Sequence, residues 1–222
     1  MNLLAIDTST EYISVGLSVG GKLKNSELRG QRQHAQVILP MIEQLLAEGG
    51  LQLSQLDAIV YGRGPGSFTG LRIACSVAKG LAYAHDLPLF PVSSLAAIAE
   101  EAFYHTEDDA SSVLAMIDAR MNQVYWACLA PHQYEVQESV DAVANITVSP
   151  VSPLILAGVG FEPYFDQLSP VIQERIIKKC LIYPQAQAMI RIALSGKIQA
   201  ISAAKASPVY IRNQVTQGEP RG

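Results

Sequence analysis

Two stretches of the chain, about half a chain length apart, repeat one short pattern, and this repeat limits the choice of fold more than any other feature. In the first copy an apolar run at residues 3–7 ends in an aspartate and leads through a polar turn into alternating apolar residues at 13–19. In the second copy the corresponding runs lie at 114–118 and 123–129. Apolar runs and strict alternation predict β-strands. We therefore predict two related α/β halves, each opening with a β-hairpin.

The remaining elements complete the two halves. In the first half, hydrophobic patterning predicts strands at 3–7, 13–19, 22–29, 58–61 and 88–92 and helices at 33–48, 71–85 and 94–103. In the second half it predicts further strands at 154–157 and 179–183 and a helix at 185–195. The segment 104–112 is polar and is expected to be a linker. We therefore expect an N-terminal domain at 1–106 and a smaller C-terminal domain at 107–222.

The composition is that of a folded chain with a large apolar fraction. Of the 222 residues, 49% are hydrophobic and 16% are charged, and the mean hydropathy is +0.19. These values are too apolar for an intrinsically disordered chain, and we expect part of the apolar surface to be buried against a partner. The net charge of −4 gives no overall positive field of the kind that binds nucleic-acid phosphates. We therefore expect little direct affinity for nucleic acid.

Cysteine and histidine usage predicts neither a disulfide framework nor a metal site. The three cysteines, Cys75, Cys128 and Cys180, show no Cys-x-x-Cys spacing, so we expect reduced thiols in a cytoplasmic protein. The opening residues enter a strand pattern at once, and no run of about eighteen uninterrupted apolar residues occurs, so we expect neither a signal peptide nor a membrane span. The histidines lack the spacing that puts two imidazoles on one helical face; they are His34, His85, His105 and His132.

The most glycine-rich stretch, residues 62–70, does not match the common phosphate-binding motifs. It lacks the Gly-Lys-Ser/Thr ending of a Walker A loop, and in a Rossmann frame starting at Gly64 the third glycine would fall on Thr69. Glycines around Pro65 suit a sharp turn from a strand into a helix, with Ser67 or Thr69 as the helix cap. An anion on that helix N-terminus is the alternative interpretation.

The polar turn of the first copy, formed by Asp7, Thr8 and Ser9, has two interpretations. An acidic residue at a strand end can orient a hydrated metal ion while hydroxyl and backbone N–H groups meet phosphates. The same residue types are favoured in a tight hairpin turn because their side chains satisfy local backbone groups. No Walker lysine lies nearby. The hairpin turn is therefore favoured, and a vestigial phosphate loop made of these three residues is kept as the alternative.

The glycine-rich stretch and the opening residues resemble one known family. Residues 62–73, Gly-Arg-Gly-Pro-Gly-Ser-Phe-Thr-Gly-Leu-Arg-Ile, and residues 4–9, Leu-Ala-Ile-Asp-Thr-Ser, are similar to the TsaB family, formerly called YeaZ. The resemblance covers nearly the whole chain. Further stretches that carry it are His34 with 38–41, 117–121 with 124–126, and 208–213.

The resemblance implies a two-lobed α/β fold of the actin, sugar-kinase and Hsp70 type, built from duplicated mixed-sheet halves. It also implies a role in forming threonylcarbamoyladenosine at position 37 of tRNAs that read codons beginning with A. The resemblance further implies that the TsaB-type protein is a scaffold that dimerises with its catalytic paralogue TsaD. The ATPase TsaE is the third member of that system. The tRNA is then expected to meet this chain only indirectly, through the complex.

One absence bears on catalysis. The catalytic paralogue carries a His-x-x-x-His metal pair just after the strand that corresponds to 88–92. This chain has Ser94 and Ile98 at the matching positions. Serine is a poor ligand for a transition metal, and isoleucine is no ligand. Nor does the chain contain a Gly-x-Ser-x-Gly elbow to aim a serine nucleophile. We therefore predict that this chain has no catalytic residues and no metal site.

Two helices are apolar around too much of their circumference for ordinary surface elements, which predicts a partner surface. On the helix at 71–85 we assign one apolar face to the domain's own sheet; it consists of Ile73, Val77, Leu81 and Ala84. The predicted partner surface consists of Leu71, Cys75, Ala78 and Ala82 on this helix and Ile38, Met41, Ile42 and Leu45 on the helix at 33–48. The alternative is that the two helices bury the excess against each other. The resemblance favours a partner, either a TsaD-like subunit or, in its absence, a second copy of this chain.

An autonomous nucleotide-dependent enzyme of the same superfold, such as a small-molecule kinase, is the alternative function. It would use Asp7 and Asp118 at the cleft between the lobes. Kinases of this architecture are generally longer than two halves of about 110 residues each, so we expect no resident cofactor and, at most, weak nucleotide binding within the complex. Arg212 is where a direct tRNA contact would be sought first, and a strand-end salt bridge is its other interpretation.

Overall fold

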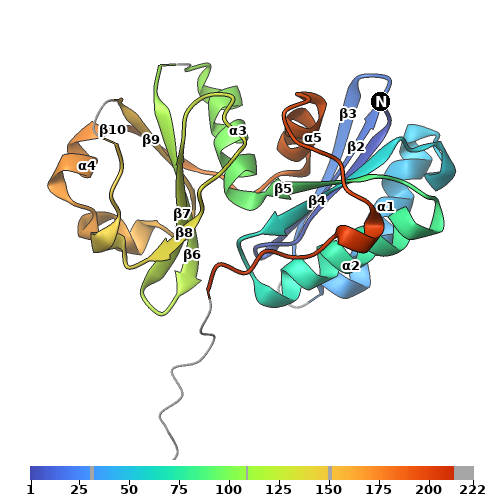
Figure 1. The fold of residues 1–222 in the computed structure, drawn as a ribbon, viewed down its shortest axis with the longest axis horizontal. Helices are drawn as coiled ribbons and strands as arrows, with labels where there is room; N and C mark the ends of the chain where they lie inside the picture. The colour runs from blue at the N-terminus through green and yellow to red at the C-terminus, as the bar shows by residue number, and fades with distance from the viewer. Residues whose placement is uncertain (31–32, 109, 150–151, 213–222) are drawn as a thin grey trace, which may run out of the picture.

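The computed structural model describes residues 1–30, 33–108, 110–149 and 152–212. Within these ranges the chain forms two five-stranded sheets. The two sheets lie on either side of a pair of helices, and further helices cover their outer faces (Figure 1). The molecule therefore consists of stacked layers: an outer layer of helices, the first sheet, a middle layer of helices, the second sheet, and an outer layer of short helices.

The first sheet has the strand order β3-β2-β1-β4-β5. β1, β2 and β3 are antiparallel, whereas β4 and β5 run parallel to β1. The central β1 is buried on both faces, as its continuous apolar run predicts. The edge strand β3 is mostly exposed and carries several charged side chains, which discourage edge-to-edge pairing. The strands are β1 (Leu3–Asp7), β2 (Tyr12–Val19), β3 (Lys22–Arg29), β4 (Ala58–Gly64) and β5 (Leu89–Ser93).

The second sheet repeats this topology. Its order is β10-β9-β6-β7-β8, with β6, β7 and β8 antiparallel and with β9 and β10 parallel to β6. β6 thus takes the place of β1, which confirms the predicted α/β fold of two related mixed-sheet halves. The strands are β6 (Ser112–Arg120), β7 (Gln123–Leu129), β8 (Ser139–Asp141), β9 (Leu154–Val159) and β10 (Ile176–Leu181).

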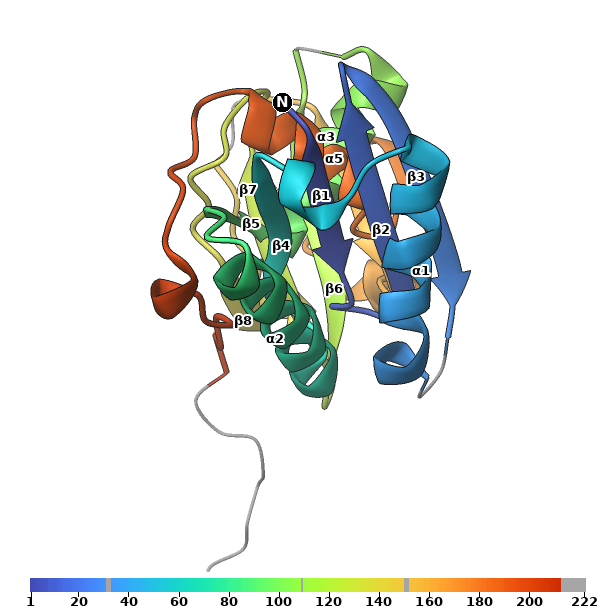
Figure 2. The same cartoon turned by 90° about the vertical axis from the view of Figure 1, so that its right-hand side faces the viewer.

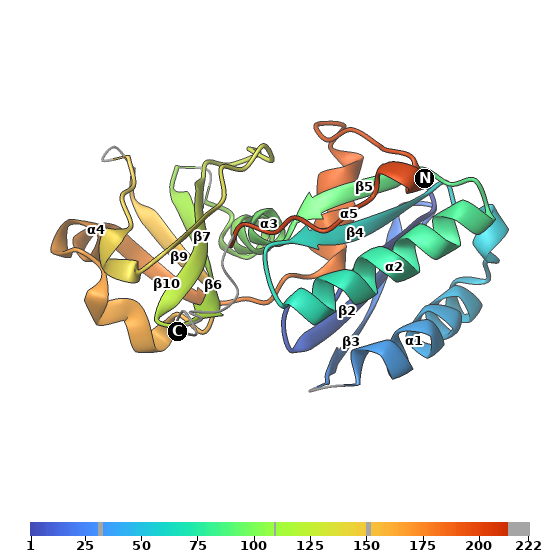
Figure 3. The same cartoon turned by 60° about the horizontal axis from the view of Figure 1, so that its bottom comes forward.

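Helices α1 (His34–Gly49) and α2 (Phe68–Ala84) cover the outer face of the first sheet (Figures 2 and 3). Leu4 and Ile6 of β1 point toward this layer and join the core that the two helices share with the sheet. α2 begins immediately after the glycine-rich turn, where the side chain of Ser67 accepts a hydrogen bond from the Gly70 N–H at 3.3 Å. The predicted cap by Ser67 is therefore confirmed.

Helices α3 (Ser94–Thr106) and α5 (Ala186–Leu194) fill the space between the two sheets. Leu3 and Ala5 of β1 and Val113 and Ala115 of β6 all point into this middle layer. Because α3 carries several small buried residues, both sheets pack closely around it. One continuous core consequently spans both halves of the molecule.

Short elements cover the outer face of the second sheet and complete the chain. The 3₁₀ helices η2 (Val143–Asn145) and η3 (Glu162–Gln167) and the short helix α4 (Pro170–Arg175) pack around a third core. η1 (Leu53–Gln55) precedes β4, and η4 (Ala203–Lys205) follows α5. In the described part of the chain, no helix is both long enough and apolar enough to cross a membrane.

The division between the halves is less simple than the sequence suggests. All strands of the first sheet precede residue 106, and all strands of the second follow it. However, α3 packs mainly on the second sheet, whereas α5 packs on β1 and β2 of the first. The segment after α5 also returns to the first sheet, where Leu89 and Ile201 exchange backbone hydrogen bonds. The segment 186–210 therefore packs mainly with the N-terminal half, although the predicted boundary between 106 and 107 assigns it to the C-terminal domain.

Candidate functional site

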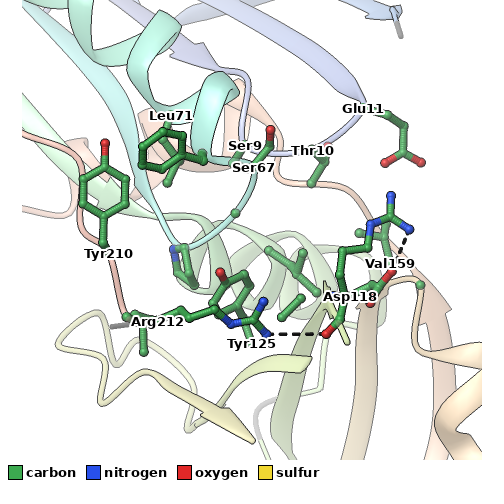
Figure 4. Close-up of a pocket in the computed structure, with 18 of the residues that line it drawn as sticks. Ser9, Thr10, Glu11, Ser67, Leu71, Asp118, Tyr125, Val159, Tyr210 and Arg212 are labelled. Carbon is green, nitrogen blue, oxygen red and sulfur yellow. Dashed lines mark hydrogen bonds and ion pairs between the residues drawn. The ribbon is translucent and has the colours of Figure 1, made fainter. Parts of the chain in front are cut away.

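A cleft of about 940 Å³ opens between the two halves and is the first candidate site. Figure 4 shows Ser9, Thr10 and Ser67 on one side of it and Asp118 and Tyr125 on the other. The cleft is lined by residues 9–11, His34, 65–68, Leu71, 117–120, Tyr125, Val159, Gly160 and 209–212. Both turns that carry the repeated aspartates lie beside it.

Asp7 ends β1, but its side chain is fully buried rather than facing the cleft. Its Oδ1 accepts hydrogen bonds from the Ser9 N–H at 2.9 Å and the Ser9 hydroxyl at 2.8 Å. Neither Asp7 Oδ2 nor Ser94 Oγ has a hydrogen-bond partner among the described residues. Burial raises the pKa of Asp7 from 3.8 to about 6, although the two hydrogen bonds from Ser9 act in the opposite direction.

The glycine-rich turn packs directly on the first loop. The Ser67 N–H donates to the Ser9 carbonyl at 2.7 Å, and the Thr8 hydroxyl donates to the Gly70 carbonyl at 2.6 Å. A Cβ on Gly66 would lie 2.3 Å from the Ser9 carbonyl oxygen, and one on Gly70 would lie 1.8 Å from that of Thr8. These two glycines are therefore required by the close approach of two loops. The sequence pattern predicts a sharp strand-to-helix turn here but not this contact.

This packing decides where the three predicted loop residues lie. Asp7 and Thr8 are fully buried beneath the glycine-rich turn, and only Ser9 reaches the wall of the cleft. The first loop is thus a closed hairpin turn in which Ser9 donates to Asp7 Oδ1, as the favoured interpretation predicts, whereas Asp7 Oδ2 has no partner among the described residues. The structure brings the loop and the N-terminus of α2 together but leaves the Asp7 carboxylate without access to the cleft.

Asp118 occupies the equivalent position in the second half, and unlike Asp7 it lines the cleft. Its Oδ1 accepts from the Arg120 N–H at 2.8 Å and from the Tyr164 hydroxyl at 3.3 Å. Its Oδ2 lies 3.2 Å from Arg120 Nη1. The Arg120 side chain is 88% exposed, so this pair is a solvated ion pair at the cleft wall. Of the two carboxylates that the sequence analysis places at the cleft, Asp7 and Asp118, Asp118 is the one that lines it.

Arg212 reaches across to the second half at the turn between β6 and β7. Its Nη2 donates to Gln123 Oε1 at 2.6 Å and to the Arg120 carbonyl at 3.4 Å. These acceptors are neutral, so the predicted salt bridge is not what holds Arg212 in place. The turn itself is of the type with positive φ at both central residues, Met121 at 55° and Asn122 at 57°.

The structure corrects the predicted partner surface on α2. Its four residues are at most 6% exposed: Cys75, Ala78 and Ala82 belong to the core between the helix and the chain's own sheet, and Leu71 is buried at the wall of the interlobe cleft. The face that the sequence analysis assigns to the sheet is the more exposed one: Ile73, Val77 and Leu81 are only partly buried, and Ala84 is exposed. The physical reason is side-chain size. The small residues under α2 let the helix pack closely on the sheet, and the larger residues remain at its flanks.

The predicted partner residues on α1 are corrected in the same way. Ile38, Met41, Ile42 and Leu45 are at most 8% exposed and belong to the core of the first lobe. Beside them, however, lies an open apolar groove of about 400 Å³ between α1 and α2. Leu39 and Phe68 are 47% and 46% exposed at this groove. Its lining consists of Ala35, Ile38, Leu39, Phe68, Thr69, Arg72, Ile73, Ser76 and Val77.

The two positions that correspond to the paralogue's metal ligands lie inside the molecule. Ser94 and Ile98 are one helical turn apart on α3, and both are fully buried in the middle layer. Within the described ranges, no group of three or more His, Cys, Asp or Glu side chains is placed to hold a metal ion.

Comparisons with known protein sequences give one consistent set of relatives. A family model described as TsaD, tRNA N6-adenosine threonylcarbamoyltransferase, matches residues 28–207. The tRNA threonylcarbamoyladenosine biosynthesis protein TsaB of Haemophilus influenzae is 36% identical to this chain, over 97% of this chain and 95% of its own length. TsaB of Escherichia coli strain K12 is 35% identical, over 97% of this chain and 96% of its own length.

A solved structure gives the same result. YeaZ from Pseudomonas aeruginosa is 37% identical to this chain and superposes on it with a TM-score of 0.85. The match covers 94% of this chain and 99% of that structure. The similarity therefore extends over both lobes, including α1, α2 and the cleft.

Proposed function

Because this chain belongs to the TsaB family, we propose that it acts in tRNA threonylcarbamoyladenosine biosynthesis as a non-catalytic scaffold for a catalytic paralogue of the TsaD type. Its involvement in that pathway follows from relatives that match over almost their full length. The scaffold role is the finer part of the proposal and is argued from the surface of the first lobe.

One observation carries the scaffold role, namely the apolar groove between α1 and α2. Figure 2 shows the two helices side by side on the outer face of the first lobe. Leu39 and Phe68 are about half exposed there, and Ile73 and Val77 are partly exposed between them. Scattered exposed apolar residues are ordinary, but a contiguous apolar groove between two helices is typical of a site that receives a partner helix.

The family match supports a TsaD-like paralogue as the occupant. The TsaD family model aligns with residues 28–207, a range that includes α1 and α2. A paralogue of this family therefore has helices equivalent to these two, and two similar helix pairs can pack face to face around a pseudo-twofold axis. A second copy of this chain presents the same surface, so self-association is expected when the paralogue is absent.

The absence of catalysis is supported by α3. By the family resemblance, Ser94 and Ile98 occupy the positions at which the paralogue carries its pair of metal-binding histidines. Neither side chain is a suitable ligand for a transition metal. Both are enclosed in the core between the sheets. We propose that catalysis belongs to the paralogue, that a TsaE-like ATPase joins the assembly, and that the tRNA is bound mainly by the other subunits. The net charge of −4 supports the last point.

The proposal is tested with the purified chain and the TsaD-like protein of the same organism. We expect the two to form a heterodimer in light scattering, and Val77→Asp to weaken it by about 100-fold or more, because docking would bury an unpaired carboxylate. Val171→Asp is the matched control, since Val171 is 63% exposed on α4 in the other lobe. It should bind like the parent chain.

Activity is measured in the same samples as modified adenosine in digested tRNA, with threonylcarbamoyl adenylate and metal supplied. The chain alone should form none, and it should support modification once the paralogue is added. Modification by the chain alone would contradict the scaffold role. Normal binding and normal modification with Val77→Asp would show that the partner docks elsewhere.

The interlobe cleft keeps the alternative of a nucleotide-dependent kinase open. Its volume of about 940 Å³ is large enough for a nucleotide, and Asp118 lines it. The burial of Asp7 argues against this function, because a kinase of this fold needs an accessible carboxylate at the first loop. Isothermal titration with ATP and magnesium decides between the two. We expect no saturable heat with the isolated chain, and one-to-one binding would favour the kinase.

A further inference from the structure

The segment 201–212, here called the C-terminal strap, runs along the first lobe beside α2 (Figure 3). It starts at the backbone pair of Ile201 with Leu89 and continues through η4, whose Ala203 is part of the α2 core. The hydroxyl of the buried Tyr61 donates to the Ser207 carbonyl at 3.2 Å and accepts from the Ser207 N–H at 3.3 Å. The strap is therefore fixed at several points along its length.

The last fixed part of the strap places Tyr210 against the first turns of α2. The Val209 N–H donates to the Arg63 carbonyl at 2.7 Å, which sets the direction of the strap. The ring of Tyr210 then lies 5.2 Å from the ring of Phe68. The Tyr210 hydroxyl accepts a hydrogen bond from Arg72 Nε at 3.1 Å.

Arg72 is thus held from two sides although it is exposed. Its Cζ lies 3.8 Å from the centroid of the Phe68 ring, a cation–π contact, and Nε is bound by Tyr210. Within the described residues, neither Nη group of Arg72 has a hydrogen-bond acceptor. The guanidinium therefore presents a planar pair of N–H donors in a fixed orientation, and the usual entropy cost of ordering a long side chain is already met.

This guanidinium stands at the rim of the α1–α2 groove. Of the nine residues that line the groove, Arg72 is the only charged one. Arginine presents N–H pairs that match the two oxygens of a carboxylate, and a bidentate pair adds orientation as well as affinity. A phosphate backbone is a poorer match to this surface, because the groove is otherwise uncharged and the chain has a net charge of −4.

We propose that Arg72 is a specificity-determining residue of the docking surface, and that it takes an Asp or Glu carboxylate lying beside the apolar face of the partner's helix. Tyr210 is its positioning residue, so the docking surface includes the C-terminal strap as well as the two helices. This inference rests on the proposed function, because it assigns the chemistry of the partner that enters the groove.

The test measures the dissociation constant of the full chain and its TsaD-like paralogue over a series of salt concentrations. Arg72→Met should weaken binding by about tenfold or more and should flatten the salt dependence, because the charged pair is lost. Arg72→Lys should keep the salt dependence but bind less tightly than the parent, because lysine offers no planar pair of donors. Arg29→Met is the matched control: Arg29 is also exposed and lies over a tyrosine ring, that of Tyr12, but sits on β3.

Tyr210→Phe separates positioning from folding. It keeps the stacking on Phe68 and removes only the hydrogen bond to Arg72, so we expect a several-fold loss of affinity at an unchanged thermal midpoint.

The proposed function and this inference fail in different ways. If the parent chain does not bind the paralogue, both are overturned. If Val77→Asp prevents binding but Arg72→Met and Arg72→Lys bind like the parent with the same salt dependence, the inference is overturned and the scaffold role stands.

Discussion

Asp7 carries a buried carboxyl group whose surroundings should affect how the stability of the chain depends on pH. Its carboxyl is fully buried, with both donors on one oxygen, and burial raises its pKa to about 6. An acid with a raised pKa in the folded state holds its proton more tightly there than in the unfolded chain. The free energy of unfolding therefore falls as pH rises from about 4 to about 6, and it stays lower above that range. The shift corresponds to about 3 kcal/mol.

Asp7→Asn should for this reason stabilise the chain at neutral pH. The amide keeps an oxygen for the two donors of Ser9 and removes the buried charge, so we expect the free energy of unfolding at pH 7.5 to rise by about 1–3 kcal/mol. The difference from the parent should shrink as pH falls from about 6 to about 4. Urea unfolding across this pH range measures both effects.

The exposed Asp166, on η3, supplies the control, and Asp166→Asn should leave the curve unchanged within about 0.5 kcal/mol. A loss of stability in Asp7→Asn at pH 7.5 would mean that the folded chain stabilises the carboxylate, contrary to the direction of its pKa.

At the scale of elements, periodicity predicts where strands and helices lie but not which face of a helix points inward. The strand patterns at 3–7 and 114–118 lead correctly to β1 and β6, because a continuous apolar run has few alternatives. On α2 both faces are apolar, so helical arithmetic finds two stripes and cannot rank them. Side-chain size decides, since small residues allow close packing on the sheet, and this preference acts only once the sheet is formed.

The candidate site was predictable to a similar extent. The positions of Asp7 and Asp118 at strand ends follow from the repeat, but their opposite exposure does not. Asp7 is buried because the glycine-rich turn packs on its loop, a contact between segments about sixty residues apart. The strap residue Tyr210 carries no local signal of its place beside Phe68, because the strap makes its contacts with elements far back in the chain.

Substitutions on the two faces of α2 test the corrected orientation. Ala78→Arg should unfold the isolated chain or cost more than about 4 kcal/mol, because Ala78 is fully buried against the sheet and a guanidinium has no room or partner there. Gly80→Arg, in the same helix, should fold and gain up to about 1 kcal/mol, because a Cβ at Gly80 meets nothing within 4 Å and glycine is a poor helix former. Thermal unfolding by circular dichroism compares the two. An unchanged midpoint in Ala78→Arg would restore the sequence-based assignment of this face to a partner.

At the scale of the whole molecule, the exchange of α3 and α5 between the halves makes them one unit. α3 comes from the first half but packs mainly on the second sheet, and α5 does the reverse. The two helices are joined by Arg191, which donates to Glu100 at 3.1 Å and also to Glu101. A second connection, Arg63 with Glu138 at 2.9 Å, joins β4 to the segment before β8. Such a molecule holds the α1–α2 groove and the interlobe cleft in a fixed relation, as the proposed scaffold role requires.

Arg191→Met should therefore destabilise both lobes together rather than release one of them. Glu101 is fully buried, and loss of its arginine leaves a carboxylate bonded only by Gln187 and His105, which is expected to cost about 3–5 kcal/mol. Combining Arg191→Met with Glu101→Gln should recover part of this loss, because the buried charge is removed.

Arg120→Met is the control, since the ion pair of Arg120 is solvent-exposed and worth less than about 1 kcal/mol. Differential scanning calorimetry should show one transition for every variant, at a lower temperature in Arg191→Met. Two separate transitions, or an Arg191→Met chain as stable as Arg120→Met, would mean that the shared middle layer does not bind the halves into one cooperative unit.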